Sequence, residues 1–183
     1  EARTTVAFNA YDLGTLSSLL RVCQTDLVLL DDKPPGARIT SFVHDETLLC
    51  TLVTGSRLRG RFTLPVDWCL LGFLHSVDPQ ESWCHGVPLE DNAMLSVMPG
   101  GMTEFALGAD SRLTFVVLPV ARFQAHVTHV RLGSTEDPSC ELPTLSGASH
   151  PLLQAYYCAL GERIDAGEVQ GDDINGLVAE HAR

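Results

Sequence analysis

Residues 82–122 have the sequence SWCHGVPLEDNAMLSVMPGGMTEFALGADSRLTFVVLPVAR. Three apolar runs lie within it, Ala93–Met98, Thr103–Leu107 and Leu113–Val120, with turn residues rich in proline, glycine and aspartate between them. Short apolar runs bounded by such residues are typical of antiparallel strands. The stretch therefore predicts a meander of strands from a small β-barrel or sandwich. Nothing in it resembles a catalytic nucleophile, a phosphate-binding loop or a metal cage.

The residues before this stretch continue the same pattern. Turn signals recur roughly every 8–12 residues, which is the spacing expected of a sandwich or barrel, and the sequence shows no βαβ alternation. Further strands are expected at 27–30, 37–43, 47–53, 57–62, 68–77 and 83–87. The sequence therefore predicts a mainly β protein rather than a Rossmann or TIM-barrel fold.

Helical periodicity flanks the strands. Asp12 is a candidate N-cap for a helix over Leu13–Val22, and a second short helix is expected over Val120–Leu132. Pro151 opens a third helix with an apolar stripe. Asp172 or Asp173 caps a last one. We expect a strand-rich domain with flanking helices over residues 1–132, a polar linker over 133–149 and a helical tail over 150–183.

The charge balance excludes one class of partner for these residues. The net charge is −11, with 12 Lys and Arg against 23 Asp and Glu, so binding to a phosphate backbone is disfavoured. No apolar run reaches the roughly 20 residues that span a bilayer, and we expect a cytoplasmic protein without membrane contact. The 6 cysteines are dispersed and several lie inside apolar runs, so we expect buried, reduced thiols.

Histidine spacing offers only a weak metal signal. His126 and His129 would share one helix face, but no third ligand follows at motif spacing. His75 and His85 lie near expected strands, yet neither belongs to a His-x-His motif. Cys84 and His85 are adjacent on an expected strand, so their side chains should point to opposite faces rather than pair. We therefore expect no metal, no cofactor and no catalytic residue.

Three arginines alternate along one expected strand. Arg57, Arg59 and Arg61 repeat with a period of two, so they share one face. If that face is outward, the guanidinium groups pair with surface carboxylates. If it is inward, an arginine could bind an anionic ligand, with aromatic side chains as apolar walls. From strand parity and residue type, the candidate ligand contacts are Arg59, Arg61, Trp68, Phe73, Trp83 and His85.

Several segments resemble the N-terminal domain of AraC-type bacterial transcription regulators. They are LPVDWCLLGFL at 64–74, residues 82–107, and LTFVVLPVARF at 113–123. The matching elements are a hairpin at Trp83–Gly86, Pro88-Leu89, Met94–Gly100, Glu104-Phe105 and a last strand ending in Leu118-Pro119. The similarity covers most of the chain, including the expected first helix, but it is diffuse.

The resemblance implies a cupin-like antiparallel β-barrel or jelly roll, with a short N-terminal helix and a C-terminal helical hairpin. It also implies an effector-sensing and dimerisation domain that controls an attached DNA-binding domain by a ligand-dependent population shift. The family's two basic helix-turn-helix units have no counterpart in residues 1–183, so DNA would be bound only elsewhere. The homodimer interface is expected on the tail helices: Leu153, Tyr156, Tyr157, Leu160, Ile164, Ile174, Leu177 and Val178. The alternatives are a metal-dependent cupin enzyme (an isomerase or dioxygenase) and a ligand-free dimerisation module.

Overall fold

The computed structural model describes residues 6–10, 24–32, 36–97, 99–100, 102–130, 144–146 and 151–181. For 6–10, 126–130 and 144–146 it describes the backbone alone. The expected helix Leu13–Val22 and most of the expected linker 133–149 lie outside the described residues, as do Cys23 and Cys140. The side chains of His126 and His129 are likewise not described.

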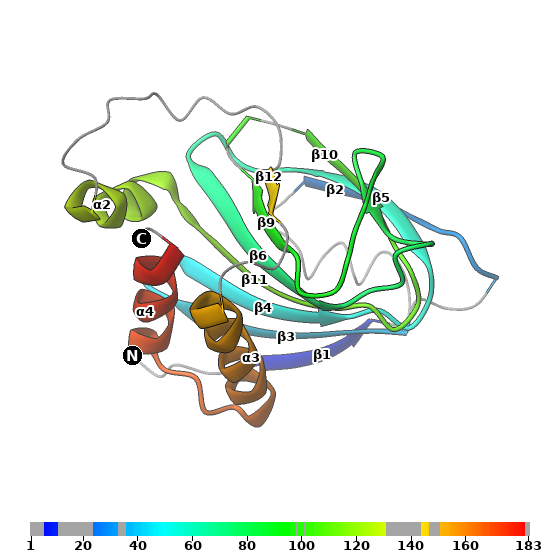
Figure 1. The fold of residues 1–183 in the computed structure, drawn as a ribbon. Coiled ribbons are helices and arrows are strands. Elements are labelled where there is room, and N and C mark those ends of the chain that lie inside the picture. Colours follow the sequence, from blue (N-terminus) through cyan, green and yellow to red (C-terminus); the bar gives the residue numbers. More distant parts are fainter. Residues whose placement is uncertain are drawn as a thin grey trace.

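Strands dominate the described chain, and helices gather towards its C-terminal part (Figure 1). In chain order the elements are β1 (Val6–Ala10), β2 (Gln24–Leu29), β3 (Ala37–His44), β4 (Thr47–Val53), β5 (Leu58–Thr63), β6 (Trp68–Ser76), β7 (Trp83–Cys84), β8 (Val87–Pro88), β9 (Met94–Val97), β10 (Met102–Leu107), β11 (Arg112–Pro119), α2 (Val120–Val130), β12 (Thr144–Ser146), α3 (Pro151–Ala166) and α4 (Gly171–His181).

The strands form two antiparallel sheets that face each other. Sheet A has seven strands in the order β1-β3-β4-β11-β6-β9-β12, and sheet B has five in the order β2-β5-β10-β7-β8. Figure 1 shows α3 and α4 on the side of sheet A that faces away from sheet B. The fold is therefore a β-sandwich of the jelly-roll kind with a few helices, which confirms the predicted fold class.

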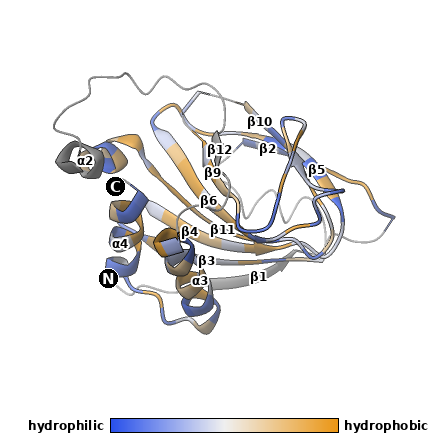
Figure 2. Ribbon diagram, in the orientation of Figure 1, coloured by the Kyte–Doolittle hydropathy of each residue, from blue (hydrophilic) through white to orange (hydrophobic). Residues whose placement is uncertain are grey.

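The central strands of sheet A are buried on both faces, because sheet B covers one face and α3 and α4 cover the other. Alternate residues of each strand therefore point into two different cores. On β6, Leu70 and Leu74 join the core between the sheets, whereas Leu71 and Phe73 join a second core beneath α3 and α4. A strand buried on both sides needs apolar residues at nearly every position. This explains why the strand expected at 68–77 is the most continuous apolar strand of the sequence, and Figure 2 shows hydrophobic colour along β6.

Three local features differ from the sequence-based expectation. The first is β1, where no strand was expected. The strand expected over 83–87 is a tight hairpin, in which β7 and β8 flank a turn with φ of 48° at His85 and 77° at Gly86. Positive φ is easy for glycine and uncommon for histidine, so the turn bends the chain at this pair. The expected linker also contains β12, which pairs with β9 in sheet A.

The tail helices pack closely on sheet A through small residues. Gly167, with φ of 75°, ends α3 in the left-handed conformation that glycine adopts readily, and Gly171 begins α4. A Cβ atom on Gly171 would overlap the buried ring of His44 on β3. Arg122 of α2 holds this arrangement from the other side, donating to the carbonyl of Asp45 at 2.6 Å and to Asn175 Oδ1 of α4 at 2.5 Å.

We predict that replacing glycine with alanine has opposite effects on the free energy of unfolding at two positions of α4. Gly171→Ala would force the buried His44 ring to move, and should lower the free energy of unfolding by about 1–3 kcal/mol. Gly176→Ala meets the hydroxyl of Tyr156, a side chain that is 38% exposed and able to swing towards solvent. At Gly176 the higher helix propensity of alanine, worth up to ~1 kcal/mol, should outweigh the cost of moving Tyr156, so this variant should be more stable than wild type. Urea denaturation of both variants measures the difference, and equal stabilities would contradict the close packing of α4 on His44.

Candidate ligand-binding site

An apolar cavity of about 100 Å³ lies in the core between the two sheets. Sheet A contributes Leu52, Leu70, Leu95, Leu113 and Phe115 to its lining, and sheet B contributes Thr25, Phe62, Cys84, Thr103, Phe105 and Leu107. Strand β6 of sheet A also contributes Gly72, Phe73 and Leu74, and Leu89 lines the cavity from the segment that follows β8. Protein interiors normally leave few voids larger than a water molecule, so a space of this size is a candidate binding site.

Gly72 on β6 makes part of this space. It pairs with Phe115 on one side and Leu95 on the other, and lies between Leu70 and Leu74 on the inward face of sheet A. A Cβ atom added there would lie 3.5 Å from Leu70 Cδ2, 3.5 Å from Phe115 Cβ and 3.7 Å from Leu95 Cβ, all ordinary contacts. Thus the fold tolerates a side chain at this position, and its absence leaves room in the cavity.

Hydroxyl groups mark one part of the cavity wall. Thr25, Phe62 and Thr103 lie side by side in one row across sheet B. Thr103 is 1% exposed, and its Oγ1 is one of two buried side-chain polar atoms without a hydrogen-bond partner among the described residues. A buried polar group left unpaired costs about 1–3 kcal/mol. The hydroxyl is therefore available to a bound molecule.

Leu107 and Leu58 pair at the other end of β10 from Thr103. The next residue, Gly108, is surrounded by buried hydrogen bonds. Its carbonyl accepts from Thr54 Oγ1 at 2.8 Å and from Ser111 Oγ at 2.9 Å, while its N–H donates to Ser82 Oγ at 2.9 Å. Because these groups satisfy one another, this part of the sandwich offers nothing to a ligand. Among the described residues of the cavity wall, the buried hydroxyl without a hydrogen-bond partner is that of Thr103.

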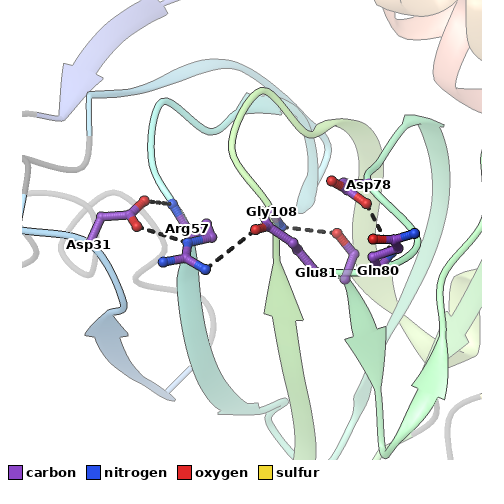
Figure 3. Close-up of polar contacts among 7 residues, drawn as sticks. Asp31, Arg57, Asp78, Gln80, Glu81 and Gly108 are labelled. Atoms are coloured by element: carbon purple, nitrogen blue, oxygen red, sulfur yellow. Dashed lines mark hydrogen bonds and ion pairs between the residues drawn. The ribbon is translucent and has the colours of Figure 1, made fainter.

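The arginines face away from the cavity, on the solvent side of sheet B. Arg57, just before β5, binds Asp31 Oδ1 at 2.8 Å and Glu81 Oε1 at 3.3 Å (Figure 3). Arg59 binds Glu104 Oε1 at 2.5 Å, and this hydrogen bond lowers the pKa of Glu104. The outward alternative is thus confirmed for this strand. These exposed ion pairs contribute little to stability.

The six expected ligand residues do not surround one site. Arg59, Trp83 and His85 gather near Glu104 on the outer face of sheet B, where the Arg59 Cζ atom lies 5.4 Å from the centre of the Trp83 ring. The remaining positions are these: Arg61 is exposed and pairs with Asp26, Trp68 is half-buried at the start of β6, and Phe73 borders the cavity although its ring lies in the second core. Strand parity placed Arg59 and Arg61 on one face of β5, but it could not tell which face is inward.

The residues expected at the dimer interface pack against other parts of the same chain. The apolar stripes of α3 and α4 pack on the outer face of sheet A, so Leu153, Tyr157, Leu160, Ile164, Ile174, Leu177 and Val178 are each at most 5% exposed. Side chains with so little free surface cannot contact a second copy in this conformation. The helical pattern therefore identified the buried face of the helices, and of the expected residues only Tyr156, at 38%, is exposed.

Phe73 connects the cavity wall to this helical cover. Gly72 faces the cavity, and the next residue, Phe73, stacks on Tyr157 of α3 with ring centres 5.3 Å apart and an interplanar angle of 13°. The Tyr157 hydroxyl lies 2.6 Å from His181 Nε2 of α4. Burial raises the pKa of Tyr157, so the hydroxyl stays protonated. A shift of β6 at the cavity would therefore alter the packing of both helices.

Polar side chains form a second contact line under α3. His75 Nε2 lies 2.8 Å from Thr114 Oγ1, which lies 3.1 Å from Thr51 Oγ1. Gly161 of α3 lies directly over this pair, since an added Cβ would be 3.3 Å from Thr114 Oγ1. Burial lowers the pKa of His75 from 6.5 to about 4, with a further contribution from the charge of Arg112. The imidazole is therefore neutral near pH 7.

The cysteines behave mostly as small apolar residues. Cys50, Cys69 and Cys84 are buried and form no disulfide, whereas Cys158 is exposed on α3, which differs from the expectation that all are buried. Burial raises the pKa of Cys69 to about 12 and that of Cys84 to about 11, so both remain thiols. Within the described ranges, no three His, Cys, Asp or Glu side chains are placed to hold a metal ion. No helix in the described part of the chain is long and apolar enough to cross a membrane.

The described residues thus define a jelly-roll sandwich with an apolar cavity and a helical cover on one sheet. Neither a protein-family model nor a curated protein matches the chain. Among solved structures, the chain is similar to CuxR, described as an AraC-like transcriptional activator. The identity is 15%, the TM-score is 0.61, and the match covers 99% of this chain and 68% of CuxR. At this identity the likeness shows a shared fold.

Two further structures match more loosely. Vicilin from hazelnut, Corylus avellana, has 9% identity and a TM-score of 0.33, over 94% of this chain and 52% of its own. YcfD, a ribosomal oxygenase from Escherichia coli, has 10% identity and a TM-score of 0.23, over 97% of this chain and 66% of its own. Similarity this low carries no argument about function.

We predict that His75 makes the fold sensitive to acid. The unfolded chain takes up a proton on this residue as the pH falls through 6.5, while the folded chain does so only near pH 4. Stability is therefore lost as the pH falls from 6.5 towards 4. His75→Gln cannot titrate, and should flatten that loss by roughly 1–2 kcal/mol, allowing for partial solvent screening. Urea denaturation at pH 7.0 and pH 4.5 measures it. Parallel pH profiles for both proteins would contradict the proposed burial of a neutral imidazole.

Proposed function

We propose that this chain is the effector-sensing domain of a transcription regulator of the AraC type. The likeness to CuxR supports the fold and coarse class, because it extends over 99% of the chain. The observation that carries the sensing role is the shared wall: Gly72 borders the cavity and Phe73 stacks on Tyr157 of the helical cover. A molecule in the cavity and the position of the helices are thereby linked through adjacent residues of one strand.

The proposed mechanism is a population shift. A bound molecule can change the balance of two conformations only by binding one of them more tightly. Here an occupied cavity would favour a slightly displaced β6, and with it a different seating of Tyr157 on Phe73. The hydrogen bond between Tyr157 and His181 would extend that change to α4. The helices, and not the sheets, would then report the bound state.

DNA contact is assigned to a different part of the regulator. The net charge of −11 is repelled by a phosphate backbone, and the arginines of β5 are already paired with carboxylates. A basic segment attached beyond the helical tail would bind DNA in this proposal. The chain itself would then have a sensing and positioning role, without chemistry of its own.

Dimerisation through the tail helices remains part of the proposal, with a corrected surface. The residues first expected at that interface are buried against sheet A, so a partner would have to contact the outer side of α3. Leu152, which is 74% exposed, lies there. Tyr156, which is 38% exposed, follows one helical turn later, with its hydroxyl towards Gly176 of α4. Tyrosine is one of the residues most often found as an anchor at protein interfaces, and the exposed leucine beside it adds apolar surface that a partner could cover.

We predict that an effector raises the thermal stability of the wild-type chain and not that of a filled variant. Ligand at about 100 times its Kd adds ~2.7 kcal/mol, roughly 5–10 °C for a domain of this size. Gly72→Val places a branched side chain in the cavity and should abolish the shift, whereas Gly72→Ala should reduce it. A thermal-shift screen of small metabolites measures both. Compounds that shift Gly72→Val as strongly as wild type bind elsewhere, and a broad library without a shift would favour a ligand-free dimerisation module.

We predict that Leu152→Glu shifts the chain from dimer towards monomer, because a charge replaces an exposed apolar side chain at the proposed contact. Val28→Glu is the matched control, since Val28 is 59% exposed on β2 of sheet B, away from the helices. Sedimentation equilibrium across a concentration series compares the two. If both variants assemble like wild type, the outer side of α3 is not the interface.

A further inference from the structure

The chemistry of the cavity wall restricts what the proposed effector can be. The described residues of the lining are aliphatic and aromatic side chains, glycine, two threonines and one thiol, and none of these residues is charged. Placing an ionised group among such side chains is strongly unfavourable unless a counter-charge is present. The side chains of Arg57, Arg59 and Arg61 point to the opposite side of sheet B and are paired with carboxylates there. An anionic or cationic effector is therefore disfavoured.

The size of the cavity restricts the ligand further. Its volume is about 100 Å³, well below the roughly 300–1,000 Å³ of sites that hold drug-sized molecules. It is closer to the ~150 Å³ apolar cavity, engineered in another protein, that binds benzene or xenon. The part of an occupant that lies within this space in the observed conformation is accordingly a single small ring or a short branched chain. Nucleotides and sugars exceed this space and would also leave many polar groups unpaired.

Thr103 adds a polar requirement. Its side chain shares the inward face of β10 with Phe105 and Leu107, which both line the cavity, and its Oγ1 lacks a partner among the described residues. Thr25 lines the same cavity from β2, separated from Thr103 by Phe62 in the strand row. A ligand with one hydroxyl or carbonyl group at this position would satisfy a buried hydroxyl that the fold leaves unpaired. A pure hydrocarbon would not.

We propose that the inter-sheet cavity binds a small uncharged molecule with an apolar body and a single hydrogen-bonding group, such as a phenol or a short alcohol, oriented by the hydroxyl of Thr103. This inference rests on the proposed sensing function, because it names the ligand class of the same cavity. It adds that the polar group of the ligand points towards the Thr25 and Thr103 row, and that its apolar body lies against Gly72 and Phe115.

The test compares three probes of similar shape: phenol, toluene and benzoate. Isothermal titration of the wild-type chain should detect phenol and toluene and give no measurable binding of benzoate at a pH where it is ionised. Thr103→Val keeps the shape of the side chain and removes the hydroxyl. It should weaken phenol relative to toluene by about two- to tenfold, while Thr103→Ser should restore the preference for phenol. The Thr103→Val variant should fold, because it removes an unpaired buried group.

Gly72→Val is the test of location, and it should abolish binding of both phenol and toluene. Benzoate binding as tight as phenol, an unchanged phenol-to-toluene ratio in Thr103→Val, or binding that survives Gly72→Val would each overturn the inference. A failure of the proposed function gives a different result. In that case phenol binds as described, yet amide hydrogen exchange in α3 and α4 is the same with and without it.

Discussion

The burial of sheet A on both faces is the constraint on which the rest of the structure depends. Each central strand must supply apolar side chains to two cores at once, because its residues alternate between the faces. On β6 this alternation places Gly72 against the cavity and Phe73 against Tyr157 of α3. The ring of Phe73 thereby packs directly against α3. Packing of this density transmits small displacements instead of absorbing them.

The two faces of the sandwich are consequently unequal. Sheet B presents paired arginines and carboxylates to solvent, and such exposed pairs add little to stability. Sheet A is covered by helices that approach it closely at two glycines. A Cβ atom at Gly161 would lie 3.3 Å from Thr114 Oγ1, and one at Gly171 would overlap the His44 ring. The helical cover can therefore respond to changes in sheet A, whereas none of the described helices packs on the outer face of sheet B. This asymmetry gives the proposed signal its direction.

The sequence predicted the fold better than the site, for a physical reason. Alternation and turn residues placed nearly all the described strands, since both are local properties, as in Thr47–Val53, which matches β4. Parity put Arg57, Arg59 and Arg61 on one face but could not show that this face is outward, because that depends on which strands pair. Likewise, the stripe from Leu153 to Ile164 marked a buried face without naming sheet A as its cover. The cavity beside Gly72 and Thr103 arises from residues far apart in the chain, and no local signal marks it.

The most direct test of the link between cavity and helices uses a probe without polar groups or specific chemistry. Amide hydrogen exchange of the chain would be measured with and without xenon under pressure, since xenon enters apolar cavities of this size. Changed protection in β6 and also in α3 around Tyr157, with the outer strands β2 and β5 much less affected, is the predicted result. Changes confined to the strands that line the cavity, with α3 and α4 unaltered, would contradict the account.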